Sequence, residues 1–248
     1  MSDLAHSSES LIGTPGDRLV DTLHGTLVEA ILDGRIGSNG RLYPGEIATM
    51  FGVSSTPVRE ALMRLAAEGF VQAVPRRGFH LTDPTVAEIR DLWQVRRGLE
   101  VLAAELTVDR LNAGEVSLEP LLDIGRRLAA PGPDRAVLRD HIDLNARFHE
   151  TIVEMSGNSI LATLFGGLRM RLLGMWIKNG HEAWQRRVRG DHAEHRAIVA
   201  ALEARDPDAA RLAVSRHIER SLVDMVADLE GRMTSQRGED KSESPRRK

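Results

Sequence analysis

One short stretch, residues 47–65 with the sequence IATMFGVSSTPVREALMRL, constrains the fold more than any other part of the chain. A helix-turn-helix needs a small residue inside its first helix, a glycine four positions later for the turn, and an apolar residue six positions beyond that glycine. Ala48, Gly52 and Val58 have these separations. The stretch therefore predicts two short helices that meet at Gly52, with buried faces supplied by Ile47, Phe51, Val53, Ala61, Leu62 and Leu65.

The second helix of this pair presents a polar face that suits DNA. Ser54 or Ser55 can cap the helix, and Pro57 falls in its first turn, where the backbone N–H has no helical partner. From a helix in the major groove, Arg59 can reach a guanine edge or a phosphate, and the hydroxyls and free amides of the first turn suit phosphate oxygens. The candidate DNA contacts on this helix are Ser54, Ser55, Thr56, Arg59 and Arg64.

After Gly69 the apolar period changes from that of a helix to that of a strand. The segments FVQAVP and FHLTD, separated by RRG, predict a β-hairpin with Arg76 and Arg77 at its tip and with Gly78 free to take a positive φ. A helix-turn-helix followed by such a hairpin predicts a winged helix, whose wing can contact the DNA backbone or the minor groove. The formal net charge of −3 means that DNA binding must depend on this local basic patch rather than on the whole molecule.

From about Pro84 onward the sequence is helical. Apolar residues recur at helical spacing, and the junctions NAGEV, APGPD, SGNS, NGHE and RDPD carry residues that stop or cap helices. Six helices are predicted, over about 85–112, 116–129, 134–156, 159–179, 182–204 and 206–230.

These patterns predict a mainly α fold with two domains. A first helix over residues 18–32 and the loop GSNGRLYPG precede the helix-turn-helix. Both termini lack apolar periodicity, which predicts disorder. The expected parts are a disordered segment at 1–16, a winged helix-turn-helix domain at 17–82, an all-α six-helix bundle at 83–232 and a disordered tail at 233–248.

The segment GVSSTPVREALMRLAAEGFVQAVPRRGFHL resembles the winged helix of the GntR family of bacterial transcriptional regulators. The segment IRDLWQVRRGLE is similar to the opening of the all-helical FCD effector domain found in the FadR branch of that family. The resemblance covers about residues 18–230 and implies a DNA-binding domain followed by an FCD-type bundle for effector binding and dimerisation. Six helices rather than seven are typical of the VanR-like subgroup.

Two departures from the family pattern concern DNA recognition. The chain has Gly45 in YPGEIA, where the family usually has an arginine or another polar residue, and it has Ser55 in VSSTPVRE, where the family has a DNA-contacting arginine. The fold expectation is unaffected, but the operator sequence cannot be inferred from the family.

A divalent-metal site in the helical domain is implied by the resemblance. Asn145 and His149, four residues apart on one helix face, together with His195 and His217, match the Asp/Asn-x3-His, His, His set of FCD domains. Three imidazoles suit zinc or nickel rather than magnesium or calcium. Asn145 replaces the commoner aspartate and brings no charge, a deficit that Asp191 can offset. The alternative is a buried polar cluster without metal.

Other residues of the helical domain receive simpler interpretations. Arg96 is, by the resemblance, the candidate partner of a small carboxylate effector. Arg97 beside it is interpreted as a solvated charge, and His141, His181 and His192 as surface residues.

Composition narrows the function. The absence of cysteine excludes disulfides, thiol nucleophiles and Cys-ligated zinc. No apolar run reaches the length of a membrane helix and no secretory leader is evident, so we expect a cytoplasmic protein without membrane contact.

The leading hypothesis is a ligand-responsive DNA-binding repressor, a homodimer on paired operator half-sites. The alternatives are a three-histidine metalloenzyme, although HETIV lacks the second histidine of H-E-x-x-H, and an architectural DNA-binding protein, which the net negative charge disfavours.

Overall fold

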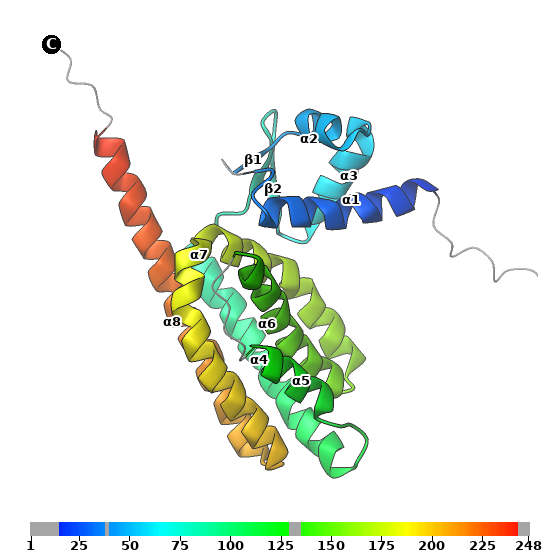
Figure 1. Ribbon diagram of the computed structural model, residues 1–248, viewed down its shortest axis with the longest axis vertical. Coiled ribbons are helices and arrows are strands. Elements are labelled where there is room, and N and C mark those ends of the chain that lie inside the picture. The colour runs from blue at the N-terminus through cyan, green and yellow to red at the C-terminus, as the bar shows by residue number, and fades with distance from the viewer. Residues whose placement is uncertain (1–14, 38–39, 129–134, 243–248) are drawn as a thin grey trace, which may run out of the picture. The chain divides into compact units, whose positions relative to one another are not determined.

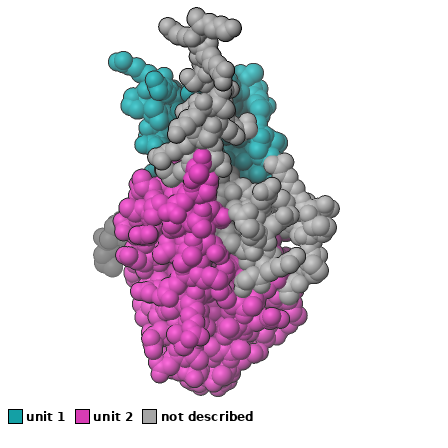
Figure 2. Space-filling view, turned by 90° about the vertical axis from the view of Figure 1, so that its left-hand side faces the viewer, with its two compact units in different colours: residues 1–82 teal, residues 83–248 magenta. Residues whose placement is uncertain are grey.

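The computed structural model describes residues 15–37, 40–128 and 135–242 of the 248-residue chain (Figure 1). The chain forms two compact units, with the boundary between Thr82 and Asp83 (Figure 2). The class is mainly α, as predicted, with a winged helix-turn-helix in the first unit and a helical bundle in the second. No helix among the described residues combines the length and the apolar character needed to cross a membrane.

The first unit contains three helices and a small antiparallel sheet of strand order β1-β3-β2. Its strand β1 was not predicted, because a two-residue strand inside the expected loop has no period to recognise. The elements are α1 (Pro15–Leu32), β1 (Arg41–Leu42), α2 (Pro44–Phe51), α3 (Ser55–Ala67), β2 (Val71–Val74) and β3 (Gly78–Leu81).

The turn between α2 and α3 forms as its sequence predicts. Gly52 has φ 67°, and its N–H points back to the carbonyls of Ala48 and Thr49. This left-handed conformation ends α2 and turns the chain, which is why a glycine stands there. Val58 and Leu65 on the inner face of α3 are fully buried, and α1 packs against α3.

The hairpin that forms the wing depends on a second glycine. Its turn lies between Val74 and Gly78, which pair across the two strands, and it leaves Arg76 with φ 62°. Gly78 has φ 80°, and a Cβ there would lie 2.8 Å from the carbonyl oxygen of Leu42. Only glycine therefore lets β3 lie between β1 and β2 at this point.

The second unit is helical throughout the residues that the structure describes (Figure 1). Its first helix begins after a reciprocal capping box between Thr85 and Glu88, and the helix that begins at Ser159 has Asn158 as its N-cap, whose side chain accepts the N–H of Leu161. Caps of this kind satisfy free amides of a first turn. The helices are α4 (Val86–Asn112), α5 (Glu119–Leu128), α6 (Arg135–Met155), α7 (Ser159–Glu203) and α8 (Pro207–Ser242).

The predicted break between helices 159–179 and 182–204 is wrong. Both segments belong to α7, a single helix of 45 residues, so the six predicted segments occupy five helices. The sequence NGHE at the expected junction contains a glycine but no proline. One interior glycine costs a helix only about 1 kcal/mol relative to alanine, which is not enough to end it.

The ends of the chain also differ from expectation. The first helix begins at Pro15, and α8 continues to Ser242, well into the tail that was expected to be disordered. That extension, residues 231–242, lacks an apolar stripe. Six of its twelve residues are strong helix formers and the other six are Gly, Ser, Thr or Asp, so helix propensity does not explain why α8 continues there. The rest of both predicted disordered segments, 1–14 and 243–248, lies outside the described residues.

The core of the second unit lies where α4, α6, α7 and α8 meet. Trp93 and Phe148 are among its largest fully buried side chains, and α4 packs along α8. The same interior also holds charged and polar side chains, namely Arg96, Glu100, His141, Asn145, His149, Asp191, His195 and His217. Charges are rarely buried without partners, so this polar interior marks the candidate site.

Candidate functional site

The predicted DNA contacts of α3 lie on its exposed face. Ser54 stands at the N-cap of α3 without a side-chain hydrogen bond to it, while Ser55, Thr56 and Arg59 are exposed. The first turn of α3 therefore presents hydroxyls and unpaired amides to solvent beside a cation, which is the arrangement that phosphate and base edges require.

The wing adds cations to the same surface. Arg59 from α3 lines one groove together with Arg76, Arg77 and Gly78 of the hairpin. Both arginines of the hairpin tip are exposed. Helix and wing thus offer one continuous basic surface within the first unit.

Arg64 lies on the exposed face of α3 as well, but it has partners. Its Nη1 donates to Asp21 of α1 over 2.5 Å, and its Nε lies 3.4 Å from a carboxylate oxygen of Glu68. This arginine ties α1 to α3, so its charge is partly compensated before any DNA arrives. The sequence alone could not indicate this, because Asp21 is far away along the chain.

In the second unit the structure brings the three predicted histidines together. His149 on α6, His195 on α7 and His217 on α8 are all buried, and each offers a ring nitrogen within 4.8 Å of the others. The Nε2 atoms of His149 and His217 are 3.3 Å apart. Two nitrogens bound tetrahedrally to one zinc ion at about 2.0–2.1 Å lie about 3.3–3.4 Å apart, so this pair has the spacing of two ligands.

Unpartnered polar atoms at the cluster support the same interpretation. Among the residues that the structure describes, neither ring nitrogen of His195 has a hydrogen-bond partner, and the Oδ1 of Asn145 has none either. Both side chains are buried. Because a buried polar atom without a partner costs free energy, these atoms fit a site that a further ligand completes. The residues present therefore fit a divalent metal, with His195 and Asn145 supplying lone pairs.

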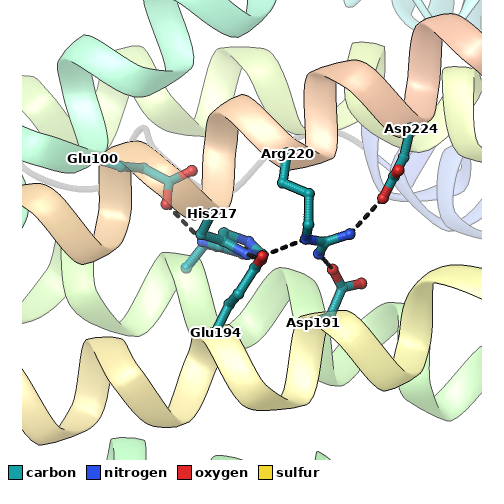
Figure 3. Close-up of polar contacts among 7 residues, drawn as sticks. Glu100, Asp191, Glu194, His217, Arg220 and Asp224 are labelled. Atoms are coloured by element: carbon teal, nitrogen blue, oxygen red, sulfur yellow. Dashed lines mark hydrogen bonds and ion pairs between the residues drawn. The ribbon is translucent and has the colours of Figure 1, made fainter.

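Two glutamates orient the imidazoles from outside the cluster (Figure 3). The Nδ1 of His149 lies 2.5 Å from Oε2 of Glu100, and the Nδ1 of His217 lies 2.8 Å from Oε2 of Glu194. A carboxylate at Nδ1 fixes the proton there and leaves Nε2 as the free lone pair. Both glutamates thus turn the two Nε2 atoms toward the centre of the cluster.

Arg96 on α4 is joined to this cluster through Glu100. Its Nε donates to Oε1 of Glu100 over 2.6 Å, while its Nη1 has no partner in the described part of the chain, and the side chain is only 2% exposed. The link from Arg96 through Glu100 to His149 is a continuous chain of polar contacts. Glu100 was not singled out by the sequence, although its position four residues after Arg96 on one helix was the available signal.

Arg220 organises the other side of the cluster (Figure 3). Its guanidinium donates to Asp191, Glu194 and Asp224, while Glu194 also holds His217. Asp191 was expected to supply charge beside Asn145, but it bonds to Arg220 instead. The carboxylates of Asp191 and Glu194, which lie beside His217, therefore already pair with the guanidinium of Arg220.

Burial sets the protonation states in the cluster. Burial lowers the pKa of His149 to about 4 although Glu100 opposes it, and burial with the neighbouring His217 holds the pKa of His195 well below its usual value. Burial would raise the pKa of Glu100, but His149 and Arg96 outweigh it and lower that pKa to about 2. At neutral pH these two imidazoles are therefore neutral, the form that binds a metal, while Glu100 is charged.

Two further histidines differ from their predicted surface position. His141 is buried and His192 is partly buried, with their Nε2 atoms 3.4 Å apart. His141, Asn145 and His149 repeat at intervals of four residues on α6 and therefore share one face of that helix. The sequence interpretation treated each histidine singly and missed this repeat.

Arg97, expected to be solvated, is exposed but pairs with Glu219 at 2.6 Å.

Two cavities adjoin the cluster from different sides. One contains Arg96 and His149 among its lining residues, and the other contains Phe148, His192 and His195. The first has walls from α4, α6 and the N-terminal half of α7, and the second from α5, α6 and the C-terminal half of α7. His149 and His195 therefore each line a cavity.

Two family models match the chain. Residues 19–81 match the bacterial regulatory proteins of the gntR family, and residues 91–220 match the FCD domain. The first match covers the winged helix and the second covers the histidine cluster.

Curated relatives are similar over most of the chain. The HTH-type transcriptional regulator YdhC of Bacillus subtilis is 31% identical over 192 residues, which is 72% of this chain and 81% of that protein. The HTH-type transcriptional repressor RspR of Escherichia coli is 26% identical over 180 residues, 70% of this chain and 74% of the relative.

Solved structures share the fold. The E. coli protein McbR/YncC is similar with a TM-score of 0.64 and 22% identity, covering 84% of this chain and 96% of that chain. A GntR-type transcriptional regulator from Rhodococcus gives a TM-score of 0.69 at 18% identity, over 84% of this chain and 97% of that chain.

Proposed function

The chain belongs to the gntR family of bacterial regulatory proteins, with an FCD domain after its winged helix, and is therefore a DNA-binding transcriptional regulator. We propose that a small organic acid, bound at a metal-containing site in the helical unit, controls its DNA binding. We propose further that it is a repressor, that it acts as a homodimer on paired half-sites in the cytoplasm, and that the acid releases it from its operator.

One observation supports the ligand part of this proposal. The buried Arg96 has an unpartnered N–H donor among the described residues, and Glu100 links it to the imidazole cluster. Arg96 keeps Nη1 free while its Nε is held by Glu100, which also bonds to His149. A carboxylate can therefore meet Arg96 while being attracted by a metal ion at the histidines. An arginine and a metal together bind an anion more strongly than either alone.

The residues that would hold the metal are His149, His195 and His217, with Asn145 as a neutral oxygen donor. Zinc or nickel suits this donor set, and the bound ion would supply positive charge and open coordination positions for an anionic ligand. Glu100 and Glu194 orient two of the imidazoles and balance part of the ion's charge.

The DNA part of the proposal assigns roles on the first unit. Arg59 is proposed to contact a base edge or a phosphate, and Ser54, Ser55 and Thr56 to contact phosphates. Arg76, Arg77 and Gly78 of the wing are proposed to follow the backbone or the minor groove. Arg64 is reassigned to a supporting role, because Asp21 and Glu68 hold its guanidinium. Two-fold symmetry in a dimer would let two such surfaces contact two half-sites.

The metalloenzyme alternative is not favoured. Both matched domains and the relatives belong to transcriptional regulators rather than to enzymes. The cluster is therefore interpreted as a sensing site.

The metal can be tested by elemental analysis of tag-free protein, followed by zinc titration of the parent and of His149→Ala and His195→Ala variants. We expect close to one zinc per chain in the parent and a loss of at least about tenfold in affinity in either variant. A parent that takes up no zinc or nickel, with or without an added carboxylate, would reduce the histidines to packing residues.

A further inference from the structure

The cavity at Arg96 has a composition that narrows the class of acid it can take. We propose that it binds a small monocarboxylate whose remaining atoms are apolar, rather than a dicarboxylate or a polyhydroxy acid. The inference rests on the proposed function and specifies its ligand. The cavity lining has three parts, which we call the cationic end, the apolar walls and the charged rim.

The cationic end is Arg96. Its side chain is 2% exposed, its Nε donates to Glu100, and its Nη1 has no partner among the described residues. A buried guanidinium donor without an acceptor is costly, and a carboxylate oxygen is the acceptor that an arginine binds best. The ligand's carboxylate therefore belongs at this end, next to His149, which also lines the cavity.

The walls of the cavity are apolar side chains. They come from α6 and α7, and they are five of the ten described residues that line the cavity. Hydroxyl groups buried there would lose their hydrogen bonds to water without replacement, whereas methylene groups gain about 0.8 kcal/mol each from burial. The wall residues are Ile142, Ala146, Phe165, Leu172 and Leu173.

The rim carries charges of both signs. Asp143 and Glu150 of α6 line the cavity together with Arg169 of α7, which lies 3.2 Å from Glu150. Arg147 pairs with Glu150 as well, also at 3.2 Å. A second carboxylate on the ligand would be repelled by Asp143 and would have to compete with Glu150 for Arg169. The rim therefore selects against diacids.

Three six-carbon acids of equal length separate these features: hexanoate, adipate and gluconate. Each is titrated by calorimetry into the full-length protein, with and without one equivalent of zinc. We expect hexanoate to bind at least about tenfold more tightly than adipate or gluconate. Arg96→Lys should weaken hexanoate binding while the protein still binds DNA selected from a random pool.

A rim variant tests the selection directly. Glu150→Gln frees Arg169 and removes a negative charge, so adipate should bind about two- to fivefold more tightly while hexanoate changes little. Glu154→Gln is the matched control, because Glu154 is also on α6 and near Arg147, at 3.7 Å, but does not line the cavity. It should leave both acids unchanged.

The outcomes separate the two levels of the proposal. Adipate or gluconate binding as tightly as hexanoate, or an unchanged adipate affinity in Glu150→Gln, would overturn the inferred ligand class and leave an acid-responsive regulator intact. If none of the three acids binds with or without zinc while DNA binding persists, both the ligand class and the proposed acid effector are wrong.

Discussion

At the residue scale, the two glutamates that hold the imidazoles are the most instructive pair. Glu100 and Glu194 each place a carboxylate on the Nδ1 of a buried histidine. They differ in their second partner, since Glu100 also holds Arg96, whereas Glu194 holds Arg220. One carboxylate thus connects the histidine cluster to Arg96, the proposed partner of the acid, and the other connects it to the ion pairs of Arg220.

This difference predicts distinct phenotypes for two isosteric variants. Glu100→Gln and Glu194→Gln should each weaken zinc binding about 10- to 100-fold in chelator competition. Each variant removes the negative charge that contacts the Nδ1 of a proposed metal-binding histidine. Only Glu100→Gln should also change hexanoate affinity in zinc-free protein, since only Glu100 touches Arg96. Equal hexanoate affinities in the two variants would show that the contact of Glu100 with Arg96 does not affect hexanoate binding.

His141 predicts a pH effect on stability. Burial, followed by the neighbouring His192, lowers its pKa to about 4 from about 6.5. Between these values the unfolded chain binds a proton that the folded chain does not, so the free energy of unfolding falls as the pH drops from 6.5 toward 4. In urea unfolding at pH 7 and pH 5, His141→Gln should lose less stability than the parent. Identical losses in both proteins would contradict a buried neutral imidazole.

Arg59 and Arg64 form a matched pair on one exposed helix face. Arg59→Ala should weaken binding to selected DNA by about 1–3 kcal/mol and relax base preference, because a base-reading arginine contributes on that order. Arg64→Ala should preserve base preference, since that arginine is held by Asp21 and Glu68. Binding-site selection with both variants measures this, and relaxed specificity in Arg64→Ala alone would reverse the assignment.

At the element scale, turns were predictable where one residue determines them, and helix ends were not. Gly52 and Gly78 both have the positive φ that their positions require. Gly180 looked like a similar signal but lies inside α7, because glycine permits a turn without enforcing one. Strand β1 exists through its pairing with β3 rather than through any pattern of its own.

Two glycines of the first unit should respond oppositely to alanine. Gly78→Ala places a Cβ 2.8 Å from a backbone oxygen at a φ of 80°, so it should lower the free energy of unfolding by more than about 1 kcal/mol. Gly25→Ala in α1 meets no atom within 4 Å and should stabilise by about 0.5–1 kcal/mol. Thermal unfolding measures both changes, and a neutral Gly78→Ala would refute the proposed constraint on the wing.

The candidate site was predictable only in part for a related reason. The spacing of Asn145 and His149 on one helix, with the family resemblance, was enough to nominate the three histidines that the structure brings together. The partners of those residues, Glu194 and Arg220, come from helices whose relative rotation no local pattern specifies. Charged partners of buried residues therefore had to come from the structure.

At the scale of the whole molecule, the basic surface and the proposed acid-binding cavity belong to different compact units. A ligand can alter DNA binding only if it binds the DNA-competent and released states with different affinities. The net charge of −3 makes this regulation feasible, because no general attraction to DNA would mask the loss of the local contacts.

The most direct test of the regulatory account is the DNA affinity of the zinc-loaded, full-length protein with and without a saturating acid. Fluorescence anisotropy on DNA selected by the protein itself gives this value, with the acid that binds most tightly in calorimetry. The account predicts about 5- to 150-fold weaker DNA binding with the acid present, and no such change in Arg96→Lys at the same acid concentration. An unchanged DNA affinity while calorimetry shows the acid bound would contradict it.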